Sequence, residues 1–279
     1  MISNVNSSLP SLGIQQSLGK SQEAQNRQIE QLSSGKRVNR AADDPAASAI
    51  ISQFAAQISG SNQAARNLND GISLAQTTDG ALSTVEDNTQ RIRELTVQAG
   101  NSTLSSSDRD AIQNEVNSLS QSNNDTLRSA NYNGQSLFQG GSITFQSGPN
   151  AGGENQISAP IGIRAAPASN GGLNTANSGI DLSSPASATA ALDSIDQDIS
   201  RIADSRASLG ALNKRFEAGI ASLQSNAENL TAARSRSADT DYAAATSRLA
   251  QEQIKANAGN ALLAQANASA SKVLSLLRT

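Results

Sequence analysis

The side chains that most often carry out chemistry are scarce in this sequence of 279 residues. It contains no Cys and no His, which excludes disulfides, thiolate and imidazole metal ligands, Cys nucleophiles and His-based catalytic triads. One adjacent carboxylate pair, Asp43 and Asp44, has the chemistry for acid–base work. Pro45 follows directly, however, and a carboxylate before Pro is typical of a helix start. We therefore assign the pair to capping and expect no enzyme, no metal and no cofactor.

The segment around that pair, LSSGKRVNRAADDPAAS (residues 32–48), predicts a short connector between two helices. An apolar-periodic stretch ends at Leu32, and Gly35 tolerates the left-handed conformation that ends helices. Asp43, Asp44 and Pro45 then begin the next helix. An ordinary loop between two helices would explain these residues. The function of the two helices must therefore be inferred from the rest of the chain.

Long helices are predicted on both sides of the middle of the chain. Residues 45–99 favour one helix, and Ser107 with Asp108 would cap another. The clearest pattern is a seam with a spacing of seven and no miss, formed by Ile195, Ile202, Leu209, Phe216, Leu223 and Leu230. Six consecutive heptads predict a coiled-coil-like helix over about 185–237. Arg206 interrupts the companion seam, and we expect its head to reach solvent.

The middle of the chain differs in composition from the helical regions. Gly, Asn and Pro separate short alternating apolar pieces over about residues 132–159, which predicts β-hairpins. Residues 160–184 are mostly small and polar, with few large apolar groups, and we expect a short exposed loop there.

The two ends carry thin apolar seams. Their members are Leu18, Ile29, Leu32, Ile254, Leu262, Leu276 and Leu277. Aromatic residues are only 2% of the chain, which suits slender helix seams better than a thick core. Neither end carries enough apolar surface to form a stable helix alone, so we expect both to become ordered with partners.

Charge and hydropathy exclude several classes of partner. The net charge is −3 and there is no Lys/Arg run, so we expect no nucleic-acid partner. No apolar run approaches the roughly 20 residues that span a bilayer, so we expect no membrane partner. The start, MISNVNSSLPSLG, shows no secretory signal. The residues alone thus predict a cytoplasmic protein, or one exported by a route without such a mark.

Several blocks in the same order resemble bacterial flagellin. They are LSSGKRVNRAADDPAASAI, NDGISLAQTTDGALSTVEDNTQRIRELTVQAGN, the hairpin pieces YNGQSLF and FQSGPNA, and LLAQANASASKVLSLL. The similarity covers roughly residues 1–150 and 185–279.

The resemblance implies a mainly α fold with long antiparallel helices in a coiled-coil-like rod. Residues 1–42 and 240–279 would pair as an inner coiled-coil domain, ordered on assembly. Residues 43–159 and 185–239 would form the rod, with 160–184 as a short variable loop in place of outer domains. The connector with Gly35, Asp43, Asp44 and Pro45 would be the spoke between the two layers.

The resemblance also implies a function and partners. Flagellins polymerise with copies of themselves into the extracellular flagellar filament for motility. They leave the cell unfolded through the flagellar type III channel, with the export apparatus, an export chaperone and the filament cap as partners. A hook–filament junction protein, an enzyme with a His-containing insert and a surface ligand-binding protein are the alternatives; the lack of His argues against the enzyme.

A host partner is implied as well. The vertebrate Toll-like receptor for flagellin contacts an Arg and a Leu in the QRxRELxVQ block and a Glu on the following helix. This sequence resembles that pattern at Arg91, Leu95 and Glu115. The neighbours that complete the surface, which also packs in the filament, are Gln90, Glu94 and Gln98. Since Arg91 and Leu95 are four residues apart, we expect one exposed helix face to present both.

Overall fold

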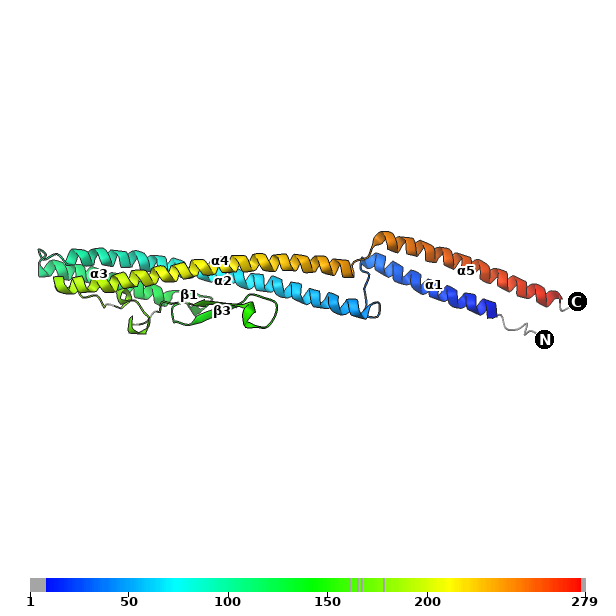
Figure 1. Cartoon of the computed structure of the whole chain (residues 1–279), viewed down its shortest axis with the longest axis horizontal. Coiled ribbons are helices and arrows are strands. Elements are labelled where there is room, and N and C mark those ends of the chain that lie inside the picture. Colours follow the sequence, from blue (N-terminus) through cyan, green and yellow to red (C-terminus); the bar gives the residue numbers. More distant parts are fainter. Residues whose placement is uncertain (1–8, 161, 165, 167, 178, 277–279) are drawn as a thin grey trace. The chain divides into compact units, whose positions relative to one another are not determined.

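The computed structural model describes residues 9–160, 162–164, 166, 168–177 and 179–276 (Figure 1). Within this part, the chain divides into two compact units, residues 1–56 with 229–279 and residues 57–228. The units group the first turns of the second long helix with the chain ends, whereas we expected boundaries near 42 and 240. Each unit is described by itself below.

Five long helices account for most of the described residues. They are α1 (Leu9–Ser34), α2 (Pro45–Ala99), α3 (Ser106–Ser129), α4 (Pro185–Ala238) and α5 (Tyr242–Leu276). The prediction of a mainly α fold with long helices is confirmed. The expected cap of α3 is displaced: Ser105, not Ser107, is the N-cap. Ser105 Oγ accepts from the Asp108 N–H while the Asp108 carboxylate accepts from the Ser105 N–H, which satisfies two donors at once.

Two short antiparallel hairpins follow α3. In the first, β1 (Asn131–Tyr132) pairs with β2 (Gln135–Ser136). Its turn is Asn133–Gly134, and both residues have the positive φ that suits a two-residue hairpin turn. In the second, β3 (Ser142–Gln146) pairs with β4 (Gln156–Pro160). The hairpins are where the turn residues predicted them.

The predicted heptad seam of α4 forms much of the rod core. Ile195, Ile202 and Phe216 are fully buried, and Leu209 and Leu223 are nearly so. Leu230 is half-buried and belongs to the other unit. These side chains join apolar residues of α2 and α3 in three successive clusters, so the core is long and narrow.

Arg206 differs from our expectation of a head reaching free solvent. Its side chain is 35% exposed and its guanidinium is paired with Asp79, at 2.8 Å, and with Glu86, both on α2. The reason is that Asp79 and Glu86 are seven residues apart on α2, about two turns along the same helix face, where the Arg206 guanidinium reaches both. Arg206 therefore joins α4 to α2 as well as covering the seam.

The segment 160–184 is not the exposed loop that we expected. Its larger apolar side chains, Ile163, Leu173, Ile180 and Leu182, are nearly or fully buried in the clusters between the rod helices. Apolar groups are few here, but these four each belong to a core cluster. Amide side chains of α3 donate to the carbonyls of Thr175, Ala176 and Ile180, so these backbone acceptors are paired where the segment docks.

In the other unit, α1 and α5 pack side by side (Figure 1). The contact uses small and polar groups: Ser21 is buried and its Oγ lies 2.9 Å from Glu252 Oε2, and Ala256 is buried beside them. The described residues contain no helix long and apolar enough to cross a membrane.

Candidate functional site

The terminal helices leave most of their predicted apolar seam uncovered. Ile29 is 52% exposed, Ile254 67% and Leu262 58%, so the α1–α5 pair leaves more than half of each of these residues uncovered. Leu18 and Leu32 are half-buried. The side chain of Leu276 and the whole of Leu277 lie outside the described part, so their place in the seam stays a prediction.

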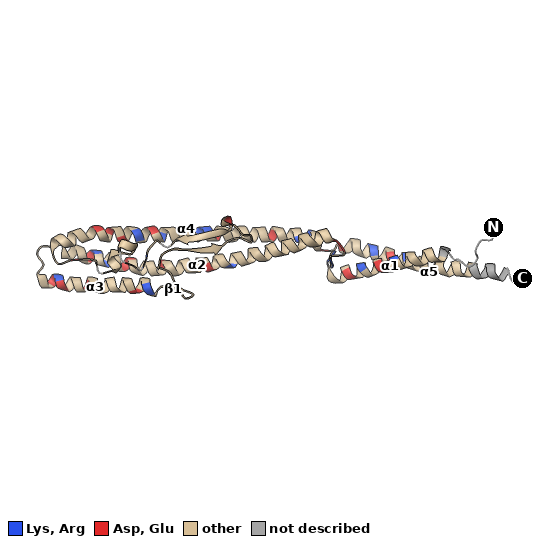
Figure 2. Ribbon diagram, turned by 90° about the horizontal axis from the view of Figure 1, so that it is seen from below, with Lys and Arg blue, Asp and Glu red and all other residues tan. Residues whose placement is uncertain are grey.

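A groove of about 670 Å³ runs between α1 and α5. Small and apolar residues such as Ile14, Leu18, Gly259 and Leu262 line much of it. The sequence between Lys255 and Lys272 contains no charged residue. Figure 2 shows the same contrast, with charged residues spread along the ribbons of α3 and α4 and almost none along the described C-terminal half of α5. Lys20, Glu252 and Lys255 also line the groove, so the charge-free part of this surface is the stretch of α5 after Lys255. Exposed apolar side chains and a concave shape are features of association surfaces.

The predicted junction is held by backbone pairing with a distant segment. Gly35 has φ +70° and its carbonyl accepts from the Thr240 N–H at 2.9 Å. Arg37 N–H donates to the Ala238 carbonyl at 2.6 Å, and the Arg37 guanidinium donates to Ser237 O at 2.7 Å. The end of α1 is thus tied to the break between α4 and α5.

The acidic pair of the junction does cap the turn and the next helix. Asp43 accepts from the backbone N–H groups of Asn39 and Arg40 at 3.1 and 2.9 Å. Asp44 accepts from the Ala47 N–H at 2.9 Å, in front of Pro45, the first residue of α2. This hydrogen bond is the main cause that lowers the pKa of Asp44.

Sequence reasoning missed the partner half of the junction. Tyr242 donates from its hydroxyl to Leu32 O at 3.2 Å, at the end of α1. A Cβ on Gly35 would lie 3.3 Å from that same hydroxyl oxygen. The helix break in the sequence near residues 239–241 was visible, but no local pattern links it to Gly35, which lies about 200 residues earlier in the chain.

The predicted receptor surface contains a charged cluster between α2 and α3. Arg91 donates to Glu94 at 3.0 Å and to Glu115 at 3.1 Å, and these bonds raise the pKa of Arg91. All three side chains are exposed, by 51% for Arg91, 69% for Glu94 and 48% for Glu115. Gln90 and Gln98 are also exposed.

Leu95 does not share that exposed face, contrary to our expectation. It is only 3% exposed and packs in the apolar cluster with Ile92 and Ala99. The reason is helical spacing: Leu95 follows Ile92 by three and precedes Ala99 by four, so it lies on the inward face. Arg91 stands at the border of that face and reaches outward.

The described residues contain no group of three or more Asp, Glu, His or Cys side chains that could hold a metal ion. The structure has long helices, a thin core, a junction held by backbone hydrogen bonds, and exposed apolar residues on the terminal helices. These features define a helical subunit of an assembly.

Comparisons with known proteins place the chain within this class. The model of the bacterial flagellin N-terminal helical region matches residues 5–142, and that of the C-terminal helical region matches residues 192–277. A flagellin of Treponema pallidum is 37% identical over 288 residues, covering 98% of this chain and 99% of the relative. The Bacillus subtilis flagellin is 35% identical over 307 residues, with the same coverage.

A solved structure of a flagellar hook-associated protein from Vibrio parahaemolyticus has a TM-score of 0.57 at 13% identity. It covers 71% of this chain and 100% of its own, and it shows the fold alone. The chain belongs to the bacterial flagellin family. It is a short flagellin, a structural subunit that polymerises into the extracellular flagellar filament for motility.

Proposed function

We propose that this flagellin assembles through the apolar faces that α1 and α5 leave exposed. Residues 1–42 and 240–279 would form the inner layer of the filament, and the rod residues 43–159 and 185–239 the next layer. The observation that carries the proposal is the exposure of Ile29, Ile254 and Leu262 on helices whose mutual contact is small and polar. Copies of the chain would cover these side chains and fill the groove between the helices.

The replacement Leu262→Asp tests this proposal. A carboxylate buried in an apolar interface is costly, so we expect no filaments by negative-stain microscopy, although the monomer keeps its helical circular dichroism. The matched control is Gln265→Asp, which adds the same charge at an exposed polar position of the same charge-free stretch. Filaments from Leu262→Asp, or equal loss in both variants, would contradict the role of the apolar face.

We infer that the chain is exported unfolded through the flagellar type III channel, with the export apparatus, an export chaperone and the filament cap as partners. The absence of Cys in the sequence and the thin core support this route, since no disulfide and no thick core must be undone before threading. The test is secretion of the chain by a flagellated host that lacks its own flagellin. Equal secretion by a host with a disabled export gate would refute this route.

We also propose that the monomer is recognised by the vertebrate Toll-like receptor for flagellin. The surface would consist of Arg91, Glu94, Glu115 and the exposed Gln90 and Gln98. Leu95 would not contact the receptor directly; its buried side chain would hold this part of α2 in place against the core. Since Arg is often a hot spot of interfaces, Arg91→Ala should cost about 2 kcal/mol or more of binding.

Reporter cells that carry the receptor test this assignment. We expect wild-type monomers to activate them, Arg91→Ala to be weak, and intact filaments to be poor activators because assembly covers the surface. Arg93→Ala is the matched control, since Arg93 is exposed on the same helix but pairs with Asp196 of α4. Silence of the wild-type monomer or full activity of Arg91→Ala would overturn the proposal.

A further inference from the structure

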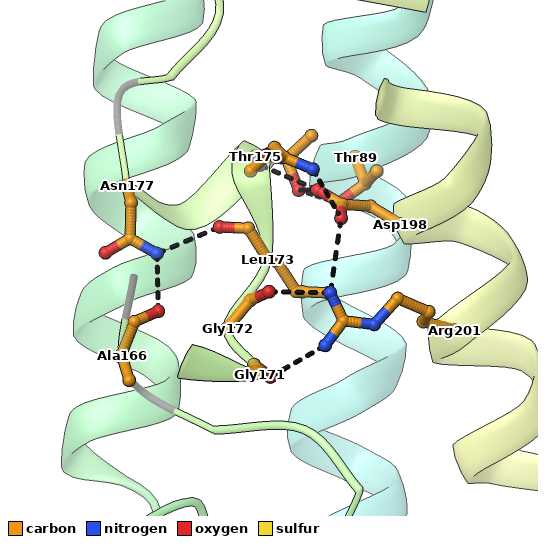
Figure 3. A network of polar contacts seen from close by, with 10 residues as sticks. Thr89, Ala166, Gly171, Gly172, Leu173, Thr175, Asn177, Asp198 and Arg201 are labelled. Carbon is orange, nitrogen blue, oxygen red and sulfur yellow. Dashed lines mark hydrogen bonds and ion pairs between the residues drawn. The ribbon is translucent and has the colours of Figure 1, made fainter. Parts of the chain in front are cut away.

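A buried polar network joins residues 171–177, which we call the strap, to the rod helices (Figure 3). The centre of the network is Asp198 of α4, a fully buried carboxylate. Asp198 Oδ2 accepts from the Thr175 N–H at 2.8 Å and from the Thr175 hydroxyl at 3.0 Å, and Oδ1 accepts from the Asn174 amide at 3.2 Å. Among the described residues, every hydrogen-bond donor to this carboxylate comes from the strap.

The Arg201 guanidinium lies near Asp198 but is turned mainly toward the strap backbone. Within the described part of the chain, only Arg201 lies within ion-pair reach of Asp198, and the distance between Nη1 and Oδ1 is 4.0 Å. The Arg201 guanidinium instead donates to the carbonyls of Gly171 and Gly172, each at 2.7 Å. On the other helices that meet the network, the contacting residues are the neutral Thr89 of α2 and Asn123 of α3.

The strap in turn depends on side chains of the bundle. Asn123 donates to Thr175 O at 3.2 Å and Asn124 donates to Ala176 O at 2.8 Å, both from α3. The strap has only one 3₁₀ turn, η3 (Asn174–Ala176), and its one large apolar anchor is Leu173. Such a segment has little stability of its own, and segments of this kind open locally without global unfolding.

We propose that the strap is a latch that opens independently of the helix bundle, and that Asp198 is the group that keeps it closed. Two opposed effects act on this one carboxylate. The three strap donors hold the latch closed, whereas burial opposes it because water no longer solvates the charge. The same two effects act on the pKa of Asp198: burial raises it, and the hydrogen bonds from the strap lower it by a smaller amount.

The latch goes beyond filament assembly, because it concerns motion within one subunit. When it opens, Asp198 becomes hydrated and the carbonyls of Gly171 and Gly172 lose the Arg201 donors. Helices α2 and α4 remain joined by the Arg206 pairs with Asp79 and Glu86 and by their apolar clusters. The strap therefore moves while the rod stays folded.

Hydrogen exchange on the monomer tests the latch. In Asp198→Leu, the Thr175 N–H loses its acceptor, and we expect amides of residues 171–177 to exchange at least tenfold faster than in the wild type. Amides of residues 85–92 in the core of α2 should be nearly unchanged. The matched control is Asp193→Leu, at an exposed Asp of the same helix, which should leave both segments unchanged.

Two results would overturn the proposal. Unchanged exchange of the strap in Asp198→Leu would show that apolar packing alone holds it, and equal acceleration in α2 would show that it does not open by itself. If Asp198→Leu does not fold, Thr175→Val keeps the carboxylate and removes one donor. Its strap should then exchange severalfold faster, and no increase would count against the latch.

Discussion

The close contact between Gly71 of α2 and Phe216 of α4 offers a strong test of the rod core. A Cβ at position 71 would stand 2.9 Å from both Cε2 and Cζ of the Phe216 ring, closer than packed carbon atoms allow. The ring is fully buried and meets Phe145 edge to face, with centroids 5.4 Å apart. It therefore has little freedom to move away, and Gly71→Ala should overpack the core.

The magnitude follows from two opposed effects. Ala stabilises a helix interior over Gly by about 1 kcal/mol, whereas overpacking a core costs about 1–3 kcal/mol. In the wild type, Gly71→Ala should therefore change the free energy of unfolding by about 0 to −2 kcal/mol. In a Phe216→Leu background the shorter side chain leaves room for the methyl group, so the same change should gain about 1 kcal/mol. The coupling between the two positions would be about 1–3 kcal/mol.

The assay is thermal unfolding of the monomer, followed by circular dichroism. A change of 1 kcal/mol moves the Tm of a domain this size by about 2–4 °C, so Gly71→Ala should leave the Tm of the wild type unchanged or lower it, and should raise the Tm of Phe216→Leu. Gly80→Ala is the matched control, because nothing lies within 4 Å of a Cβ built at that position of the same helix. It should stabilise both backgrounds equally. Equal effects of Gly71→Ala in both backgrounds would refute the contact.

Four further substitutions can be tested on the same monomer. Leu209→Ala should cost about 2–5 kcal/mol and Arg206→Ala about 1 kcal/mol or less, since its ion pairs are partly exposed; the reverse order in urea titrations would contradict the seam. Gly35→Ala should cost about 1–2 kcal/mol locally, because φ is +70° and Tyr242 crowds the Cβ, and unchanged exchange of the Thr240 amide would exclude this. Burial raises the pKa of Asp198 above its ordinary value of 3.8, so the part of its contribution to stability that is linked to protonation is complete below that value and is lost as pH rises through the raised pKa, while the hydrogen bonds with the strap remain. The stability of the wild type relative to Asp198→Asn should thus fall as pH rises, and a constant difference would contradict the shift.

Much of the fold was predictable because local sequence patterns specify local structure. Asp44 and Pro45 mark the start of α2, Asn133–Gly134 marks a hairpin turn, and the heptads of α4 mark a long seam. Each of these signals acts within a few residues, through a cap, a φ angle or a repeat. The family was also readable, since several blocks occur in order.

Tertiary structure decided which side chains face one another. The spacing of Arg91 and Leu95 predicted a shared exposed face, but packing of α2 against its neighbours buries Leu95 and leaves Arg91 outside. Likewise, Ile254 and Leu262 follow an apolar pattern, yet the packing of α5 against α1 leaves them 67% and 58% exposed. A periodic pattern defines a helix face, and only the neighbouring elements determine what covers it.

The docking of residues 171–177 shows the same division most clearly. The sequence by itself determined that this stretch is polar, rich in small residues and unable to form a long helix or strand. The sequence of this stretch did not predict its burial. The side chains that bind the strap are those of Asn123, Asp198 and Arg201, which lie more than 20 residues away from their strap partners in the chain. Those hydrogen bonds exist only once α3 and α4 lie beside the strap, and they satisfy backbone groups that would otherwise have kept it in water.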